Sequence, residues 1–470
     1  MKRVLAGAAL LLAAGAVTAA YIVERLGVAP RALAPYIEKR TSGHNPLIVG
    51  AGHYASAMLL WLDRGAPKES AAPALVLGAQ PRAAAPVAGD VVPVASVDAL
   101  RAALAQARAG QTIVLQPGVY RVGGAPLDAQ RAGADGAPIV VRAATPGTVQ
   151  LEFDLVEGFR VKGPHWRFEN LSIRGVCGED RYCEHAFHVV GAASHFAAVN
   201  NTISDFNAHI KINGEHGRFP DLGLIEHNTL TASRARRTAN PVTPIDLVAA
   251  SGWTIRANVI SDFIKAEGDR ISYGAFAKGG GRGNVFERNL VWCERTLRAQ
   301  PGQRVGLSLG GGGTGKEVCR DGRCIAEQDE GVLRANLIMG CSDVGIYLNS
   351  AAASRIEDNT LLDTAGIHVR FPTSSARLDG NLVDGPIRSR NGGLLHLEDN
   401  RSTPLWQVYA GYHPVRRLFA ADGADLRWRG SAPDRAAGRP SGVDLCGAAR
   451  SGAVYGAFER FEPCLASMIP

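Results

Sequence analysis

An asparagine that returns at near-regular intervals is the feature that most constrains how this chain of 470 residues can fold. After residue 165, eight segments each place an asparagine ahead of a pair of mostly apolar residues: RFENLSI, AVNNTI, IEHNTL, IRANVI, FERNLV, LRANLI, IEDNTL and LDGNLV. These asparagines are Asn170, Asn201, Asn228, Asn258, Asn289, Asn336, Asn359 and Asn381, at intervals of 31, 27, 30, 31, 47, 23 and 22 residues. A period in the low twenties is typical of one coil of a β-helix.

The repeat predicts an all-β fold, a right-handed parallel β-helix in which each coil stacks on the one before. Asparagine suits such a stack because its amide both donates and accepts hydrogen bonds, which links like residues in successive coils. The 55 glycines fit an architecture with many tight turns. The longer intervals indicate loop insertions, which usually gather on one face of a solenoid and form a binding cleft there.

The repeat also divides the chain into parts. We expect residues 93–401 to form the β-helix and residues 402–470 to pack over the stack or cap it. Residues 24–92 are rich in Ala and Pro and are interpreted as a linker or N-terminal packing segment, with a helix at 53–64. A helical pattern from 96 to about 109, with Ser96 as N-cap, predicts a short helix that covers the open first coil.

The N-terminus has the pattern of a targeting segment. Lys2 and Arg3 precede an apolar run from Val4 to Ala20, and small residues at 17–19 offer a cleavage site, so residues 1–23 resemble a secretory signal peptide. If the run is extended to Val23 it is long enough for a membrane anchor, which is the alternative. Either interpretation places the body of the protein outside the cytoplasm: periplasmic or secreted, or anchored to the inner membrane.

Eight cysteines, an even number, fit that oxidising location. Neighbours in the sequence suggest the disulfides Cys177–Cys183, Cys319–Cys324 and Cys446–Cys464, which leaves Cys293 with Cys341. No C-x2-C pair occurs, so the cysteines predict no metal site.

The net charge of +7 is compatible with an acidic polymer, a nucleic acid or an anionic membrane surface, without choosing among them. Residues 310–316 match the first part of a phosphate-binding loop, but Glu317 occupies its Ser/Thr position. We expect no nucleic-acid partner, and we expect a monomer.

Strand alternation gives a candidate site, because the apolar residues mark the inside of each coil. One outer face then carries eight polar residues from coils about 4.8 Å apart. We assign Lys278, Tyr347, His368 and Arg370 as catalytic, and Lys211, Asn213, Asp246 and Asn349 as substrate-binding. Cations can neutralise the carboxylate of a uronate, which acidifies its C5 proton, and Lys278, Tyr347 or His368 can serve as base or acid.

Three segments, AGQTIVLQPGVY, GAPIVVRAATPGTVQL and WRFENLSIRG, resemble the opening coils of the polysaccharide lyases that include chondroitinase B and alginate lyases. The similarity extends from about Ser96 to Asn400. It implies cleavage of uronic-acid polymers by β-elimination, with a lysine as base, an arginine on the next coil, and calcium held by acidic residues just before the lysine.

The residues that carry this chemistry are not matched. PIDLVAASGWTIRAN aligns with the lysine-bearing coil of the family and places Ala249 at the lysine position. Val242 and Pro244 fall at the calcium carboxylates, whereas Asn213 matches the remaining ligand and Lys278 takes the arginine position. We therefore predict no cofactor and assign no metal-ligating residue; calcium stays open as an alternative, although its carboxylate ligands are not matched.

Three functions remain open. The first is an extracytoplasmic polysaccharide lyase that cleaves an acidic, uronate-containing glycan by β-elimination. The second is a uronate C5-epimerase, which shares the proton abstraction. The third is a non-catalytic carbohydrate-binding or envelope protein that kept the fold, and Ala249 is the residue that favours it. A hydrolase with paired carboxylates is weakly supported, because Asp246 is the one clear carboxylate on the face.

Overall fold

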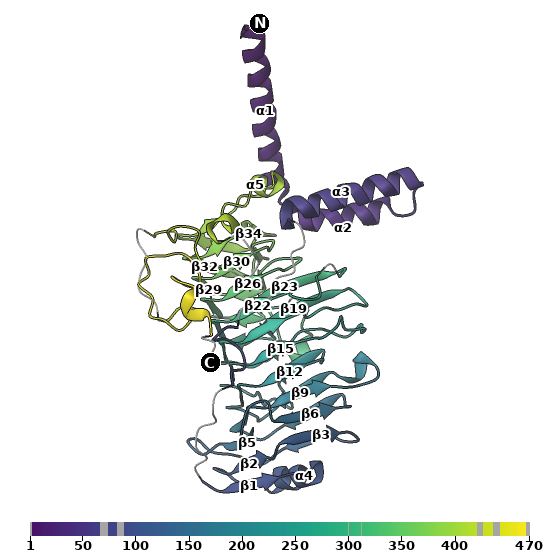
Figure 1. The fold of residues 1–470 in the computed structure, drawn as a ribbon, viewed down its shortest axis with the longest axis vertical. Helices are drawn as coiled ribbons and strands as arrows, with labels where there is room; N and C mark the ends of the chain where they lie inside the picture. The colour runs from purple at the N-terminus through teal and green to yellow at the C-terminus, as the bar shows by residue number, and fades with distance from the viewer. Residues whose placement is uncertain are drawn as a thin grey trace.

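The computed structural model describes residues 2–65, 74–81, 89–298, 300–311, 313–420, 426–435 and 442–466, with side chains from residue 13 onward. Three long parallel sheets run the length of the molecule, and each full coil passes through them in turn (Figure 1). The prediction of a right-handed parallel β-helix is confirmed. The apolar interior predicted from alternation is also present, and includes an aromatic stack of Phe159, Phe168, Phe187 and Phe196.

The first sheet has 12 strands. They are β1 (Val91–Val94), β2 (Thr112–Leu115), β5 (Ile139–Ala143), β8 (Trp166–Glu169), β11 (Ala197–Val199), β14 (Leu224–Glu226), β17 (Thr254–Arg256), β21 (Val285–Glu287), β25 (Val332–Arg334), β29 (Ser354–Glu357), β32 (Ser375–Asp379) and β35 (Leu394–Leu397).

The second sheet has 11 strands. They are β3 (Gly118–Val122), β6 (Val149–Phe153), β9 (Ser172–Gly175), β12 (Thr202–Ser204), β15 (Thr229–Thr231), β18 (Val259–Ser261), β22 (Leu290–Trp292), β26 (Leu337–Met339), β30 (Thr360–Leu362), β33 (Leu382–Val383) and β36 (Arg401–Ser402).

The third sheet has 10 strands and carries the candidate site. They are β4 (Leu127–Ala129), β7 (Glu157–Val161), β10 (His185–Val190), β13 (Ala208–Asn213), β16 (Ile245–Val248), β19 (Ile271–Lys278), β23 (Gln303–Leu309), β27 (Ile346–Asn349), β31 (Ile367–Arg370) and β34 (Ile387–Arg390). A small sheet of β20 (Gly281–Arg282), β24 (Gln328–Asp329) and β28 (Ala351–Ala352) lies in the loops that follow.

The asparagine ladder lies at the turn between the first and second sheets. From Asn201 to Asn381 each side-chain Nδ2 donates to the Oδ1 of the next asparagine over 2.8–3.1 Å, and the last link reaches Asn400. Asn170 is not part of it, which corrects the predicted start. Leu171 takes the ladder position of that coil, and Asn170 instead accepts a hydrogen bond from Asn200 in a neighbouring left-handed turn.

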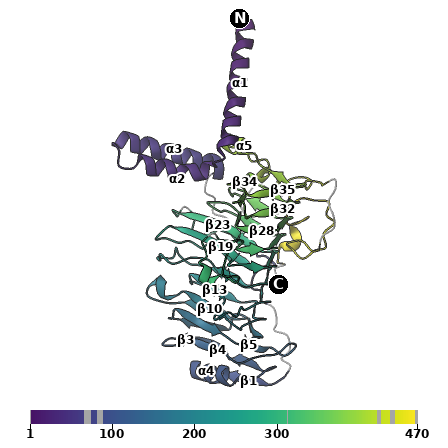
Figure 2. The ribbon, with the colours of Figure 1, turned by 180° about the vertical axis from the view of Figure 1, so that it is seen from behind.

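The two ends of the solenoid are covered by helices from different parts of the chain. The predicted N-terminal capping helix is confirmed as α4 (Val97–Gln106), and the Ser96 hydroxyl accepts a hydrogen bond from Ala99 N. At the opposite end lie α1 (Lys2–Leu26), α2 (Pro30–Thr41), α3 (Pro46–Arg64) and α5 (Leu405–Tyr409), as Figures 1 and 2 show. The helix expected at 53–64 therefore begins earlier, and α2 adds a second one.

Residues 74–81 lie against the second sheet. Gly78 N donates to Ala257 O, and Gln80 N donates to Asn200 Oδ1. The C-terminal segment packs on the same sheet through an apolar cluster that includes Val415, Phe419 and Phe458. This segment holds two short 3-10 helices, η3 (Arg416–Leu418) and η4 (Glu462–Cys464). Two others, η1 (Asp180–Tyr182) and η2 (Lys316–Val318), lie in earlier loops.

All four predicted disulfides are confirmed: Cys177–Cys183, Cys293–Cys341, Cys319–Cys324 and Cys446–Cys464. Among the helices whose side chains are described, none has the length and apolar character to cross a bilayer. Most of the apolar run proposed as signal or anchor (residues 4–20) precedes residue 13, so its side chains lie outside the described residues.

Candidate functional site on the third sheet

The outward side chains of the third sheet form one row that can be followed from coil to coil. Strand pairing aligns Asp128, Arg160, His188, Lys211, Asp246, Phe276, Ser308, Tyr347, His368 and Arg388. A second row, two residues further along the strands, contains Asn213, Val248, Lys278, Asn349, Arg370 and Arg390. All eight predicted site residues therefore share this face, but they divide into two groups with Lys278 between them.

The first group is the Tyr347 cluster, which we define as Tyr347, Asn349, His368 and Arg370. Arg370 Nη1 donates to the phenolic oxygen of Tyr347 over 3.1 Å, and its Nε donates to Asn391 Oδ1 over 3.1 Å. Both Tyr347 and Arg370 are half-buried, so each keeps a surface open to solvent. A guanidinium has five N–H donors, and those of Nη2 remain able to meet a carboxylate.

His368 is less accessible than the strand alternation predicts. Its side chain points outward from the strand but is buried, with 8% of its surface exposed. Burial, followed by the nearby charges of Arg390, Arg388 and Arg370, lowers the pKa of His368 to about 3. The imidazole is therefore neutral near pH 7, which favours the predicted role of base over that of acid.

Asn349 is likewise closed off from solvent, at 7% exposure, which weighs against direct contact with a polymer. Its Oδ1 has no hydrogen-bond partner in the structure. Tyr273 lies near Tyr347 against the same apolar residues, and burial raises its pKa to about 12. Tyr347, in contrast, accepts a hydrogen bond from Arg370.

Lys278 lies two strands away from Asn349, about 10 Å along the axis. Its ammonium group sits 4.5 Å from the centre of the Phe276 ring, and its side chain runs against the backbone of Gly311. Glu327 fixes the glycine-rich loop there by accepting hydrogen bonds from Gly311 N and Gly313 N. Lys278 is half-buried and placed to bind an anion, but not to act on the same atom as Tyr347.

The second group is the His188 cluster, which we define as Glu157, His188, Lys211, Asn213 and Asp246. His188 bridges two coils: Nδ1 lies 2.7 Å from Glu157 Oε1, and Nε2 lies 2.8 Å from Asn213 Oδ1. The hydrogen bond from His188 is the main cause of a lowered pKa at Glu157. Lys211 Nζ donates to Asp246 Oδ2 over 2.8 Å.

Asp246 was predicted to be exposed, but only 5% of its surface is accessible. Lys211 in the adjacent strand accounts for one oxygen, whereas Oδ1 is buried without a hydrogen-bond partner. Alternation places a side chain on the outer side of a sheet, yet long neighbours and inserted loops decide whether water reaches it. A short carboxylate beside a lysine is covered for this reason.

The residues at the position of the family's calcium site do not fit that ion. Asn213 Oδ1 is occupied by His188, and Val242 and Pro244 are buried and offer no side-chain oxygen. Hard cations such as calcium need six to eight oxygen ligands. Elsewhere in the described ranges, Cys319, Asp321 and Cys324 come close enough to share an ion, but the two cysteines form a disulfide.

Ala249, at the position of the family's base, is fully buried under the largest insertion. Arg320 from that insertion donates to Ala249 O over 3.2 Å, forms a two-pronged ion pair with Asp221 at 2.7 and 2.8 Å, and stacks on Phe219. This Arg320 clamp (Arg320, Asp221 and Phe219) fills the space over the strand where the family would place its lysine.

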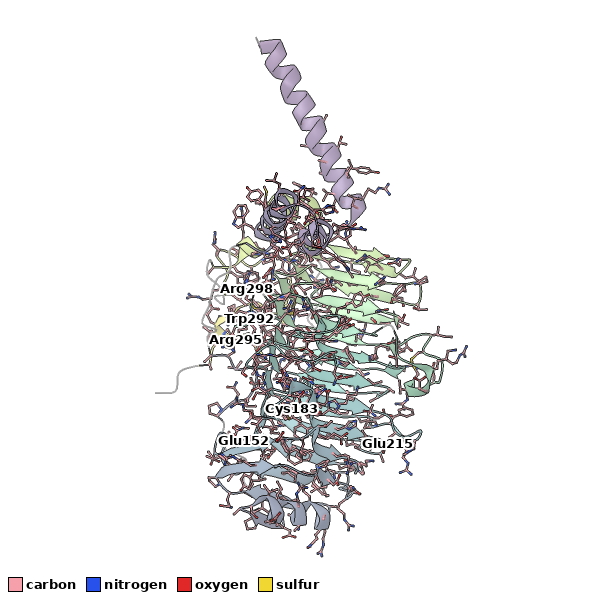
Figure 3. All side chains as sticks on the ribbon, turned by 90° about the vertical axis from the view of Figure 1, so that its right-hand side faces the viewer. Glu152, Cys183, Glu215, Trp292, Arg295 and Arg298 are labelled. Carbon is pink, nitrogen blue, oxygen red and sulfur yellow. A yellow bond between two sulfur atoms is a disulfide. The ribbon has the colours of Figure 1, made fainter. Side chains whose placement is uncertain are left out.

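Sequence reasoning missed two parts of this face. His188 could have been found, because the same outward register extends one coil before Lys211. The Arg320 clamp could not, since it joins loops that are 99 residues apart and no repeat fixes their path. A further ion pair, between Lys162 and Glu215 at 2.9 Å, marks the edge of the face, where Figure 3 shows Glu215 projecting from the solenoid.

Comparisons with known proteins agree with the parallel β-helix fold. A family model described as Chondroitinase B matches residues 94–232, which span the first coils up to β15. No curated protein sequence gives a significant match. The predicted resemblance to the β-helix polysaccharide lyases is confirmed as a distant one.

One of the similar solved structures supports the architecture. Pectate lyase Pel9A superposes with a TM-score of 0.52 at 15% identity, covering 76% of this chain and 90% of its own. An alginate lyase from Paenibacillus sp. str. FPU-7 gives 0.40 at 14% identity, with 66% and 99% covered. A PL6 family polysaccharide lyase from Pseudopedobacter saltans gives 0.36 at 13% identity, with 73% and 100% covered. The likeness to Pel9A shows the fold alone, and chemistry has to come from the site.

Proposed function

We propose that the protein is an extracytoplasmic polysaccharide lyase that cleaves a uronate-containing glycan by β-elimination at the Tyr347 cluster. The observation that carries the proposal is the hydrogen bond from Arg370 to the Tyr347 phenol on the open face of the third sheet. The match to the chondroitinase B model supports the class of reaction, and four disulfides support an oxidising location.

The pair can perform both proton transfers of the reaction. Arg370 donates to the uronate carboxylate through its remaining N–H groups, which stabilises the negative charge that develops when C5 loses its proton. Tyr347, as phenolate, takes the C5 proton. The electron pair forms the C4–C5 double bond, the C4–O bond breaks, and the phenol returns the proton to the leaving oxygen.

A polymer lying along the solenoid axis would pass over Lys278 as well. The outward rows from β19 to β34 carry Lys278, Arg370, Arg388 and Arg390, and the chain as a whole has a net charge of +7. Cations distributed along the solenoid axis suit a polyanion whose charges repeat along its length. Lys278 would then bind the carboxylate of a neighbouring sugar.

The test is an ultraviolet assay for the new C4–C5 double bond with alginate, chondroitin or dermatan sulfate, and pectate as substrates. Tyr347→Phe keeps the ring and should lower the rate by roughly 10²–10⁴ fold. Tyr182→Phe, an exposed phenol outside the cluster, is the matched control and should leave the rate unchanged. Lys278→Ala should raise KM more than it lowers kcat. Full activity in Tyr347→Phe would overturn the assignment.

One observation favours a second candidate, a carbohydrate-binding protein without activity: Ala249 is buried beneath the Arg320 clamp where the resembling lyases have their base. Binding of a polymer with no absorbance change would support that reading. Deuterium uptake from solvent without cleavage would instead indicate a C5-epimerase.

A further inference from the structure

Helix α3 presents an apolar face that nothing in the described structure covers. From Pro46 to Leu62 it contains no Lys, Arg, Asp or Glu. Leu47, Tyr54, Met58 and Trp61 are exposed by 85%, 74%, 51% and 63%, and their spacing places them on one side of the helix. Contiguous apolar exposure of this kind marks an interaction surface.

The apolar surface continues onto α1. Val17, Tyr21, Ile22 and Leu26 are exposed by 50–70%, and residues 13–19 are exposed on every side of the helix. The sequence from Val4 to Val23 contains no charged residue. A helix that is apolar all round is suited to surroundings that are apolar all round, which a lipid provides and a protein groove does not.

The arrangement of the three helices matches a planar boundary. Figures 1 and 2 show α1 leaving the end of the solenoid and pointing away from it, while α2 and α3 lie at the solenoid end of α1 and run crosswise to it. In both views α3 lies on the side of α2 that is further from the coils. A surface placed along α3 would therefore receive α1 and leave the β-helix on the other side.

Two arginine–tyrosine pairs lie on α1 and α2. Arg25 Nε donates to Tyr21 OH over 2.9 Å, and Arg40 Nε donates to Tyr36 OH over 3.0 Å, with each guanidinium also over its partner's ring. Tyrosine and tryptophan are enriched where apolar chains meet lipid headgroups, and arginine there can reach phosphate.

The hairpin of α2 and α3 is fixed to the coils. Arg31 is buried and pairs with Asp63 of α3 and with Asp363 of the solenoid, the latter over 3.1 Å. Arg64 reaches Glu294 over 3.1 Å. An orientation imposed on α3 is therefore passed to the third sheet.

We propose that Leu47, Tyr54, Met58 and Trp61 of α3, together with the exposed residues of α1, form a platform that docks on a phospholipid bilayer. Helix α3 lies in the plane of the headgroups, α1 enters the lipid, and the solenoid stands with its axis directed away from the surface. The outer face of the third sheet then points sideways, along the membrane and not toward it. This inference does not rest on the lyase activity.

The experiment uses the full chain and vesicles of phosphatidylcholine and phosphatidylglycerol, with lipids brominated near the headgroup as fluorescence quenchers. The quenched signal in the wild type should fall clearly in Trp61→Phe. Trp428→Phe is the matched control, since Trp428 stacks on Phe419 in the C-terminal segment, and it should retain the quenching. The triple variant Leu47→Ser, Tyr54→Ser, Met58→Ser should weaken vesicle binding at least tenfold while the circular dichroism spectrum stays unchanged.

Vesicle binding in which Trp61 is not quenched would overturn the platform, because α1 would then act alone. A concentration-dependent dimer in sedimentation, lost in the triple variant and accompanied by no vesicle binding, would also overturn it and assign the face to a second copy of the chain.

Discussion

Asn289 and Asn336 are joined by an amide hydrogen bond of 3.0 Å although 47 residues separate them in the chain. The neighbouring links span 31 and 23 residues with the same geometry. The largest insertion therefore leaves and re-enters the coil without disturbing the ladder. Hydrogen bonding at this turn sets the register, and length variation is confined to loops on the side of the third sheet.

Asn336→Ala should destabilise the protein by about 4 kcal/mol, because four side-chain hydrogen bonds of about 1 kcal/mol each are lost in a buried site. Asn336 Nδ2 donates to Phe286 O and Asn359 Oδ1, and its Oδ1 accepts from the backbone N and the side-chain Nδ2 of Asn289. Urea unfolding followed by circular dichroism measures the change. Asn400→Ala, at the half-exposed end of the ladder, is the control and should cost clearly less, since water can replace its partner. Equal losses of stability in the two variants would contradict the idea that burial strengthens the ladder hydrogen bonds.

Local sequence patterns explain how much of the fold could be predicted. The recurring asparagine, the alternating apolar residues and the neighbouring cysteines are local patterns, and they gave the β-helix, its outward rows and the four disulfides. Asn170 was assigned to the ladder by mistake. It matches Asn200, whereas the adjacent Asn201 belongs to the ladder, and the repeat alone does not show which of the two faces inward.

What could not be predicted depends on contacts between distant loops. The burial of His368 and Asp246 depends on neighbouring side chains and insertions that no periodicity describes. The Ala- and Pro-rich N-terminus gave no sign that Arg31 would bind Asp363 at the far end of the solenoid, 332 residues away. Long-range ion pairs leave no signature in a single sequence.

Three buried histidines should make the protein sensitive to acid. Burial is the main cause that lowers the pKa of His185 and His209 to about 4 and that of His368 to about 3. The unfolded chain takes up these protons below about pH 6.5, whereas the folded chain does not. Stability should therefore be complete above pH 6.5 and fall by about 1.4 kcal/mol per pH unit for each histidine down to about pH 4.

The check is the free energy of unfolding between pH 7 and 4 for the wild type and for His368→Gln. The variant should show a shallower loss, and His396→Gln, with an exposed ring, should follow the wild type. A variant curve parallel to the wild type would show that His368 is protonated in the folded protein.

Arg320→Gln should loosen the largest insertion while leaving the solenoid intact. The ion pair with Asp221 is partly exposed, so its loss should cost less than about 1 kcal/mol of overall stability. The amides of residues 313–324 should exchange hydrogen for deuterium faster, because the clamp is what ties this loop to Phe219 and Ala249. Arg323→Gln, exposed in the same loop, should exchange as the wild type does. Unchanged exchange in Arg320→Gln would mean that the disulfide and the hydrogen bonds to Glu327 hold the loop without the clamp.

Arg31→Met should detach the helical hairpin from the solenoid. Burial by itself would lower the pKa of Arg31, but Asp63 and Asp363 more than offset this and raise it above the usual value, so the guanidinium stays charged. Removing it deprives the buried Asp63 of its cation, whereas Asp363 keeps Arg64 and Arg298, and breaking such a buried pair costs about 3–5 kcal/mol. The loss should fall on docking of α2 and α3, because the ladder and the sheets do not involve Arg31.

Hydrogen exchange should therefore rise in residues 30–64 and stay unchanged in the coils from Asn201 to Asn289. Arg40→Met, an exposed cation on the same helix, should change neither region. If exchange rose throughout the coils instead, the hairpin would be part of the folding unit of the solenoid, and an orientation set at α3 would be coupled to the stability of the whole third sheet.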